Sequence, residues 1–284
     1  MGTLHDLNAT FIEGGKGPLF TLHHAPQKQN EHSECIVVSP SFAEEMNRCR
    51  YMQTMLAQAL TARGYGLVSV DLYGTGDSAG EFGEASWQGW IEDTIAATHY
   101  ATQLGYQNIS LLGVRLGALV GMAAAPSIEN LKSLILWQPV SSGKATLTQF
   151  LRLKIASAMA RGETGITTAQ LEEEINRGLS IQIAGYDVSP DLFSGINTAH
   201  LSHHLHFTST PVSWFTIVPS TEKKTPRVDI QTIEKWRSNG ADIAHQAIVG
   251  PAFWQAHERS LAPDLIPATI ATITNSEAIK GPAK

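Results

Sequence analysis

The segment GVRLG at 113–117 has the spacing with which a protein presents a reactive side chain. It follows the apolar run NISLL at 108–112 and leads into a run of small residues, which predicts a sharp strand-to-helix turn. The residue at the tip of such a turn has a strained backbone, and flanking glycines avoid clashes with the neighbouring strand and helix. A serine at the tip would be a nucleophile. Here the tip residue is Arg115, whose guanidinium stays protonated and cannot attack a substrate.

The elements around this turn alternate between apolar runs of strand length and longer stretches of helical period. This pattern is typical of a mostly parallel sheet covered by helices on both faces. An N-terminal hairpin is predicted at 10–13 and 19–23, further strands at 35–39, 67–71, 108–112, 133–137, 212–218 and 245–249, and helices at 44–63, 86–104, 116–125 and 230–238. No strong pattern follows Pro263. The expected fold class is α/β, with loops for ligands at the carboxyl edge of the sheet.

The segment 143–206 interrupts this alternation. Its sequence reads as helices, including TLTQFLRLKIASAMA and TAQLEEEINRGL, with no strand pattern between them. We expect a helical lid at 143–206, inserted into a core formed by 1–142 and 207–284.

Several motifs carry a resemblance to a known family. The elbow spacing and the pattern Asp71-x-x-Gly74-x-Gly76-x-Ser78 resemble the α/β-hydrolase superfamily. A narrower similarity, to the second hydrolase-like protein associated with the exosortase A system, rests on FAEEMN (42–47), GDSAG (76–80), WxxWIED (87–93), GxRxGA (113–118), LWQP (136–139) and QFLR (149–152). Those proteins are encoded near bacterial genes for exopolysaccharide export and surface-protein sorting. The resemblance implies an α/β-hydrolase fold with about eight strands and a lid.

The superfamily also implies where a catalytic acid and base would lie. The acid follows the strand after the lid, where Glu222 is the sole carboxylate of the loop 219–226. Because two lysines follow it, a solvated surface charge is the favoured alternative. The base follows the last strand, where Phe253 and Trp254 occupy the first positions and His257 comes a few residues late. An exposed histidine at a helix start is the favoured alternative for His257.

One hypothesis for Arg115 is an anion site. The helix start offers free N–H groups and the positive end of a helix dipole. In an active hydrolase the Leu116 N–H and one from Phe42 or Ala43 would bind an oxyanion. A guanidinium added to these groups suits phosphate, sulfate or carboxylate.

The alternative for Arg115 is an internal salt bridge. Glu44 and Glu45 begin the helix next to the Phe42–Ala43 loop, and either could pair with the guanidinium and close the site. A buried arginine needs a partner of some kind, and the sequence leaves both hypotheses open.

Other side chains could do chemistry but have plain structural explanations. The further nucleophile candidates Ser41, Ser78, Ser141 and Cys49 lie near the same sheet edge, without a histidine next to them in the sequence. The histidines of HLSHHLH at 200–206 have spacings that can bind Zn²⁺, yet no carboxylate or cysteine is nearby to complete a site. We expect no metal and no cofactor.

Composition bounds the partners. The chain has 284 residues, 43% of them hydrophobic, and a formal charge of -6 from 26 acidic and 20 basic residues. Without a basic patch, nucleic acid and anionic membrane surfaces are excluded as expected partners. The first residues do not resemble a signal peptide, no apolar run would span a bilayer, and two cysteines make no disulfide framework. We expect a soluble, cytoplasmic protein.

Two functional hypotheses follow. In the first, the chain is a degenerate hydrolase that binds an anionic small molecule, a partner protein or a second copy of itself. In the second, it is an active ester or thioester hydrolase, or an acyl transferase, with a non-standard catalytic group. The missing serine favours the first, and the family association favours the second.

Overall fold

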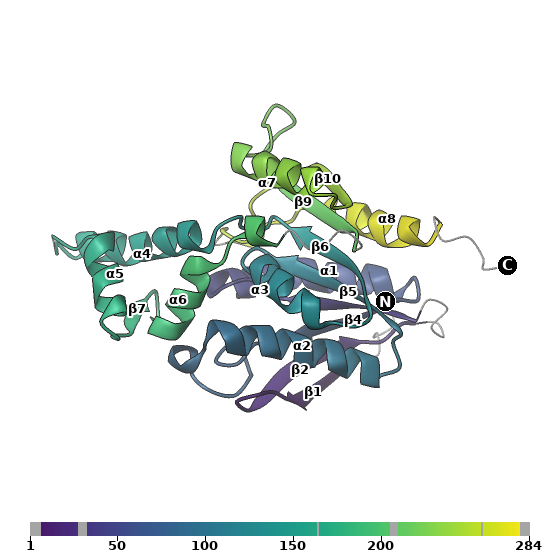
Figure 1. Ribbon diagram of the computed structural model, residues 1–284, viewed down its shortest axis with the longest axis horizontal. Helices are drawn as coiled ribbons and strands as arrows, with labels where there is room; N and C mark the ends of the chain where they lie inside the picture. Colours follow the sequence, from purple (N-terminus) through teal and green to yellow (C-terminus); the bar gives the residue numbers. More distant parts are fainter. Residues whose placement is uncertain (1–6, 28–32, 164, 205–209, 257, 279–284) are drawn as a thin grey trace.

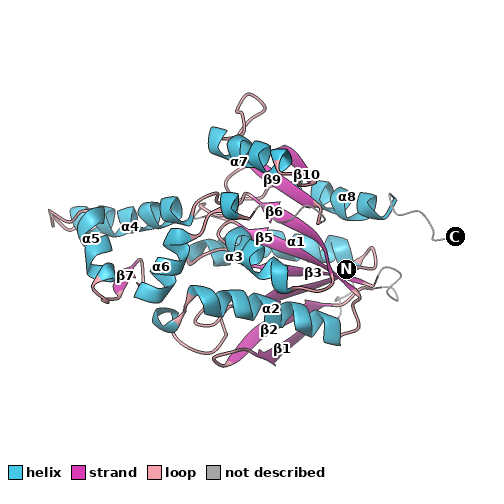
Figure 2. Ribbon diagram, viewed as in Figure 1, coloured by secondary structure: helices cyan, strands magenta, loops and turns pink. Residues whose placement is uncertain are grey.

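The computed structural model describes residues 7–27, 33–163, 165–204, 210–256 and 258–278. A twisted eight-stranded sheet runs through it, in the order β1-β2-β4-β3-β5-β6-β9-β10 (Figures 1 and 2). The strands are β1 (Leu7–Glu13), β2 (Pro18–His24), β3 (Glu34–Ser39), β4 (Gly66–Val70), β5 (Asn108–Val114), β6 (Leu131–Trp137), β9 (Val212–Val218) and β10 (Ile243–Val249). The helices that cover it are α1 (Glu44–Thr61), α2 (Trp87–Gln103), α3 (Gly117–Ala124), α7 (Arg227–Ser238) and α8 (Leu265–Ala278).

Strand directions follow the predicted architecture. β1 pairs with β2, and β2 with β4, in antiparallel fashion, whereas every pair from β4 to β10 is parallel. The predicted fold class, a mostly parallel sheet of about eight strands covered by helices, is therefore confirmed. All six parallel strands end at one edge, so the loops that follow them meet there.

The sheet separates two hydrophobic clusters. Successive residues of a strand point to opposite faces, so Val37 belongs to the cluster under α2, α3 and α7, while Ile36 and Val38 belong to the one under α1 and α8. The runs CIVVS and SLILW read as continuously apolar because both of their faces are covered.

Between β6 and β9 the chain forms a separate group of elements, which we call the α4–η3 segment. It comprises α4 (Gly143–Ala160), α5 (Thr168–Asn176), β7 (Ile181–Ile183), β8 (Tyr186–Val188), α6 (Pro190–Thr198) and the 3₁₀ helix η3 (Leu201–His203). It projects beyond the carboxyl edge of the sheet at the left of Figure 1. The expectation of helices alone was wrong, because β7 and β8 form a hairpin. Its three-residue strands are too short to show a period of two, and its turn has positive φ at Ala184 and Gly185.

A helix, α8, follows Pro263, where the sequence shows no strong pattern. Helix α8 covers the back of the sheet with Ile266, Ile270 and Ile273, and its Thr269 Oγ1 accepts a hydrogen bond from Trp137 Nε1 at 2.9 Å. A proline at the third position hides the start of this helix in the sequence, although the first turn of a helix tolerates proline.

Helix α3 begins where the backbone of β3 passes very close. A Cβ atom built on Gly117 would lie 2.2 Å from the Ser39 carbonyl oxygen and 2.3 Å from that of Pro40. Only glycine allows this approach, because a backbone oxygen cannot move aside as a side chain can. The same helix contains Gly121, whose added Cβ would meet the flexible side chain of Leu111 at 3.1 Å.

We predict that Gly117→Ala lowers the free energy of unfolding by about 3 kcal/mol, because β3 and α3 must separate to admit the methyl group. Gly121→Ala, the matched control in the same helix, should cost clearly less, since Leu111 can change its rotamer. Urea unfolding of both variants checks this. Equal losses would mean that the approach to β3 is not the constraint.

Candidate functional site

The turn between β5 and α3 has the predicted elbow geometry. Arg115 at its tip has a φ of 56°, and its N–H donates to the Trp137 carbonyl at 3.0 Å. A Cβ on Gly113 would lie 2.4 Å from the Cα of Ala118, so glycines are required on both sides of the tip. The backbone is that of a nucleophile elbow, and the side chain it presents is a guanidinium.

The Arg115 guanidinium is held on several sides. Its Nε lies 3.2 Å from Glu45 Oε2 and its Nη2 lies 3.2 Å from Glu45 Oε1, while Nη1 donates to the Gln138 carbonyl at 3.2 Å. The ring of Trp254 lies 4.8 Å from its Cζ, which is cation–π geometry. The side chain is only 11% exposed. The charge of Arg115 is therefore matched inside the protein.

Of the two glutamates that could close the site, Glu45 does so. The Glu44 side chain is 53% exposed, accepts a hydrogen bond from Tyr186 and lies 3.8 Å from Arg48. An anion that binds Arg115 would have to displace Glu45, whose side chain is 24% exposed. Anion binding at Arg115 stays a prediction, and the anion would have to compete with the Glu45 carboxylate.

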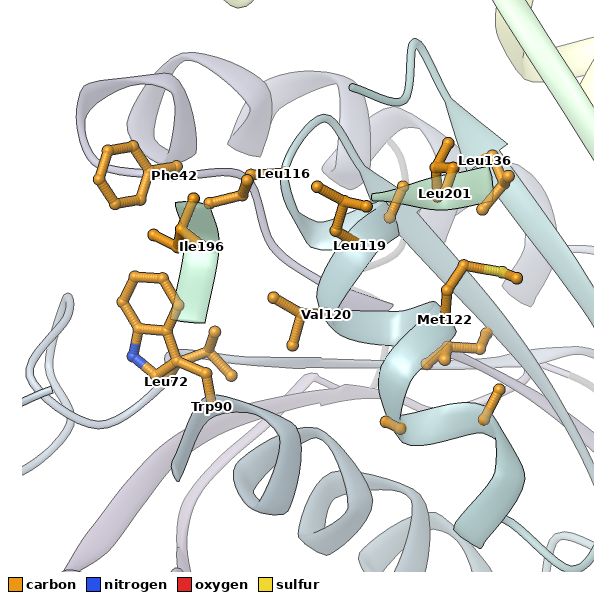
Figure 3. Close-up of a cluster of buried hydrophobic side chains, with 14 of the residues drawn as sticks. Phe42, Leu72, Trp90, Leu116, Leu119, Val120, Met122, Leu136, Ile196 and Leu201 are labelled. Carbon is orange, nitrogen blue, oxygen red and sulfur yellow. The ribbon is translucent and has the colours of Figure 1, made fainter. Parts of the chain in front are cut away.

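The positions expected to bind an oxyanion lie under apolar side chains. Within the described residues, neither the Ala43 N–H nor the Leu116 N–H has a hydrogen-bond partner. Phe42 and Leu116 belong to one buried cluster (Figure 3). The Phe42 ring lies 5.0 Å from Phe150 of α4 and 5.8 Å from Phe82, centroid to centroid. The α4–η3 segment thus contributes an aromatic contact to this loop.

The candidate acid Glu222 does not lie with Arg115. It is exposed in the loop after β9, without an ion pair to any residue that the structure describes. Asp229 in the first turn of α7 is buried, and the charge of Arg115 acts on its carboxyl group. Burial raises the pKa of this carboxyl group, whereas the hydrogen bond from Ser141 Oγ, at 3.0 Å, and the guanidinium lower it.

Sequence reasoning missed Asp229 because it placed the start of this helix at residue 230 instead of Arg227. The available signal was Pro226 followed three residues later by the acidic Asp229. A proline and then an acidic residue in the first turn are typical of a helix start.

The place of a catalytic base is occupied by aromatic rings. Phe253 and Trp254 follow β10 and are 2% and 5% exposed, and Phe253 packs against Trp137 at 6.5 Å between ring centroids. His257, the candidate base, lies outside the described residues. Among the residues described, the side chain that follows β10 and lies beside Arg115 is the indole of Trp254.

Three of the other four candidate nucleophiles have structural explanations, and the fourth, Ser41, is buried beside the Cys49 thiol. Burial raises the pKa of the Cys49 thiol to about 12, so it stays protonated. Ser78 Oγ donates to the Asp71 carbonyl, and Ser141 Oγ donates to Asp229. A serine–histidine contact does occur in η3, where His200 Nδ1 lies 2.7 Å from Ser202 Oγ. The same nitrogen also accepts the Ser202 N–H, so this contact caps the short helix.

Comparison with known proteins agrees with this geometry. Residues 30–176 match the family model described as serine aminopeptidase, S33, over slightly more than half of the chain. The chain belongs to this family. Its fold is the α/β-hydrolase fold, so the superfamily resemblance of the sequence is confirmed. A comparison with curated protein sequences gives no match.

Solved structures of this fold cover nearly the whole chain. Est1E from Butyrivibrio proteoclasticus, with ferulic acid bound, has 19% identity and a TM-score of 0.65, over 95% of this chain and 100% of that one. A carboxyl esterase from Bacillus coagulans has 12% identity and a TM-score of 0.66, over 96% and 99%. A putative hydrolase from Agrobacterium vitis S4 has 15% identity and a TM-score of 0.62, over 95% and 98%. At these identities the likeness concerns the fold.

Two features, a metal-binding cluster and a membrane-spanning helix, are absent from the described residues. These residues contain no group of three or more His, Cys, Asp or Glu side chains placed to hold a metal ion. None of the helices described is both long and apolar enough to cross a membrane.

We predict that Arg115→Gln and Glu45→Gln each lower the free energy of unfolding by about 1–2 kcal/mol, because each leaves a partly buried charge without its partner. The double variant should lose less than the sum of the two, by about 1 kcal/mol. Glu44→Gln, on the neighbouring exposed residue, is the matched control and should change it by less than about 0.5 kcal/mol. Chemical unfolding measures all four, and additive losses would contradict the pairing.

Proposed function

We propose that this protein is a degenerate α/β-hydrolase, which binds a ligand or a partner and does not hydrolyse at its elbow. The observation that carries this proposal is Arg115 at the nucleophile position, ion-paired with Glu45. A serine hydrolase needs a hydroxyl there and an imidazole within hydrogen-bond reach of it. In support of the proposal, Arg115 is ion-paired with Glu45 and its guanidinium lies against the indole of Trp254.

Electrostatics supports the same proposal. Catalysis of acyl transfer depends on donors aimed at a developing negative charge. At this elbow the strongest donor already faces a carboxylate, and aromatic side chains border the Phe42 loop. The site is therefore better suited to hold the surrounding loops in place than to stabilise an oxyanion.

The proposal also includes the cellular system in which the protein acts. The motifs quoted for the exosortase-associated proteins, such as GDSAG and LWQP, support a role beside exopolysaccharide export or surface-protein sorting, on the cytoplasmic side. The second candidate is an active ester or thioester hydrolase or an acyl transferase. The observation in its favour is the 2.7 Å contact between His200 and Ser202, which lies outside the elbow.

We predict no turnover of short-chain p-nitrophenyl esters or amino-acid arylamides above a heat-denatured sample. The reason is that the tip of the elbow is Arg115 and that, among the residues described, the ring of Trp254 lies beside it. Stopped-time absorbance assays, with an active esterase as positive control, measure this. A saturable rate that disappears when a fluorophosphonate labels one serine would support the second candidate, and mapping the label would test Ser202.

We predict that Arg115→Ser alone creates no hydrolase, because triad members act as a unit and one restored member recovers little. The backbone of the elbow accepts serine, and the unpaired Glu45 should cost about 1–2 kcal/mol, since it is partly solvated. A single-turnover acylation assay with an activated ester measures the reaction.

Arg115→Ala is the matched control, because it removes the same ion pair and adds no hydroxyl. Both variants should acylate at the same background rate. A stoichiometric burst followed by turnover in Arg115→Ser alone would show a histidine already placed as a base, and the proposed function would be wrong.

A further inference from the structure

A polar groove lies beside the elbow, between the outer face of α1 and the chain that follows β10. Its volume is about 430 Å³. One side is formed by residues spaced as i, i+3, i+4 and i+7 along α1, namely Asn47, Arg50, Tyr51 and Thr54. The other side includes Arg259 and Ser260, with Phe253 and Ala256 as apolar parts of the lining.

The groove gathers three guanidinium groups that are held in different ways. Arg48 is fixed to the chain opposite by a hydrogen bond to the Gln255 carbonyl at 2.8 Å. Arg259 reaches back across the groove, with its Cζ 4.2 Å from the centre of the Tyr51 ring. Arg50 donates to both carboxylate oxygens of Asp71, at 2.8 and 2.9 Å. These contacts orient the arginines before any ligand binds.

The charges of these arginines are not all compensated. Asp71 neutralises Arg50, and Arg48 lies 3.8 Å from the exposed Glu44. Arg259 has no carboxylate within 4.0 Å among the residues described, and Glu258 is the one acidic residue of the lining. The lining itself therefore holds three arginines and one glutamate, and the other two carboxylates, Asp71 and Glu44, lie outside it.

We infer that this groove binds the phosphate group of a small organic phosphate. Arg259 and Arg48 present planar forks of donors, which match the oxygens of a phosphate monoester in a bidentate way. The side-chain amide of Asn47 adds an uncharged donor, whereas the hydroxyls of Thr54 and Ser260 donate to the carbonyls of Arg50 and Glu258 and can accept from a protonated phosphate oxygen. The volume exceeds that of a bare phosphate ion, and the apolar lining by Phe253 and Ala256 suits a carbon skeleton.

This inference goes beyond the proposed function and has an independent readout. The groove residues do not include Arg115, Glu45 or the elbow glycines. If phosphate did not bind, the proposal that the elbow is inactive would be unaffected. If the protein hydrolysed esters, the inference of phosphate binding in the groove would be unaffected.

The experiment is isothermal titration of the full chain with phenyl phosphate, inorganic phosphate and phenol. We expect saturable binding of phenyl phosphate, weaker binding of inorganic phosphate and none of phenol. Arg259→Gln should weaken phenyl phosphate binding about tenfold or more, because one charged donor pair is lost. Arg48→Gln should also weaken it.

The matched control is Arg63→Gln, which removes the same charge from an exposed arginine just beyond α1 and outside the groove. It should change the affinity less than twofold. Because Arg259 is exposed, its variant should unfold at the wild-type temperature, which circular dichroism checks. Absence of saturable binding, equal binding of phenol, equal binding of inorganic phosphate, or an equal loss in Arg63→Gln would each overturn the inference.

Discussion

The close approach of Gly117 to the end of β3 is the constraint on which this structure depends. It brings the start of α3 against the Ser39 and Pro40 carbonyls, and Arg115, two residues earlier at the tip of the turn, has a positive φ of 56°. Any side chain at position 115 is thereby directed toward the carboxyl edge of the sheet, where the start of α1 also lies. The backbone of the fold therefore determines where this side chain lies, whatever its residue type and chemistry.

An arginine at this buried position requires neighbouring groups that compensate its charge and accept its hydrogen bonds. Its guanidinium is too deeply placed to rely on water, so a carboxylate, a carbonyl and an indole ring surround it. The carboxylate comes from the first turn of α1. Burial raises the pKa of Asp229 in α7, and the charge of Arg115 acts against that rise. The elbow is then a structural junction between α1, α3 and the chain after β10.

Family membership and loss of the serine are compatible, because the same fold supports many different sites. The eight-stranded sheet and its two cores need the apolar strands and the elbow glycines, which this chain retains. Hydrolysis needs a nucleophile and a base, for which Arg115 and Trp254 are no substitutes. Phe253, the neighbour of Trp254, also lines the groove that contains Arg48, Arg50 and Arg259.

The sequence by itself determined the strands, most helices and the elbow, because these depend on residues close together in the chain, through periodicity and glycine spacing. It also placed an arginine, Arg115, at the tip of the elbow. Only the tertiary structure decided that Glu45, not Glu44, pairs with Arg115, and that the charge of Arg115 acts on Asp229. Glu45 and Asp229 are 70 and 114 residues away from Arg115 along the chain, so these interactions depend on how the sheet brings its loops together. The short hairpin β7–β8 and helix α8 were missed for a related reason, since packing against the rest of the molecule stabilises them more than their own sequence pattern does.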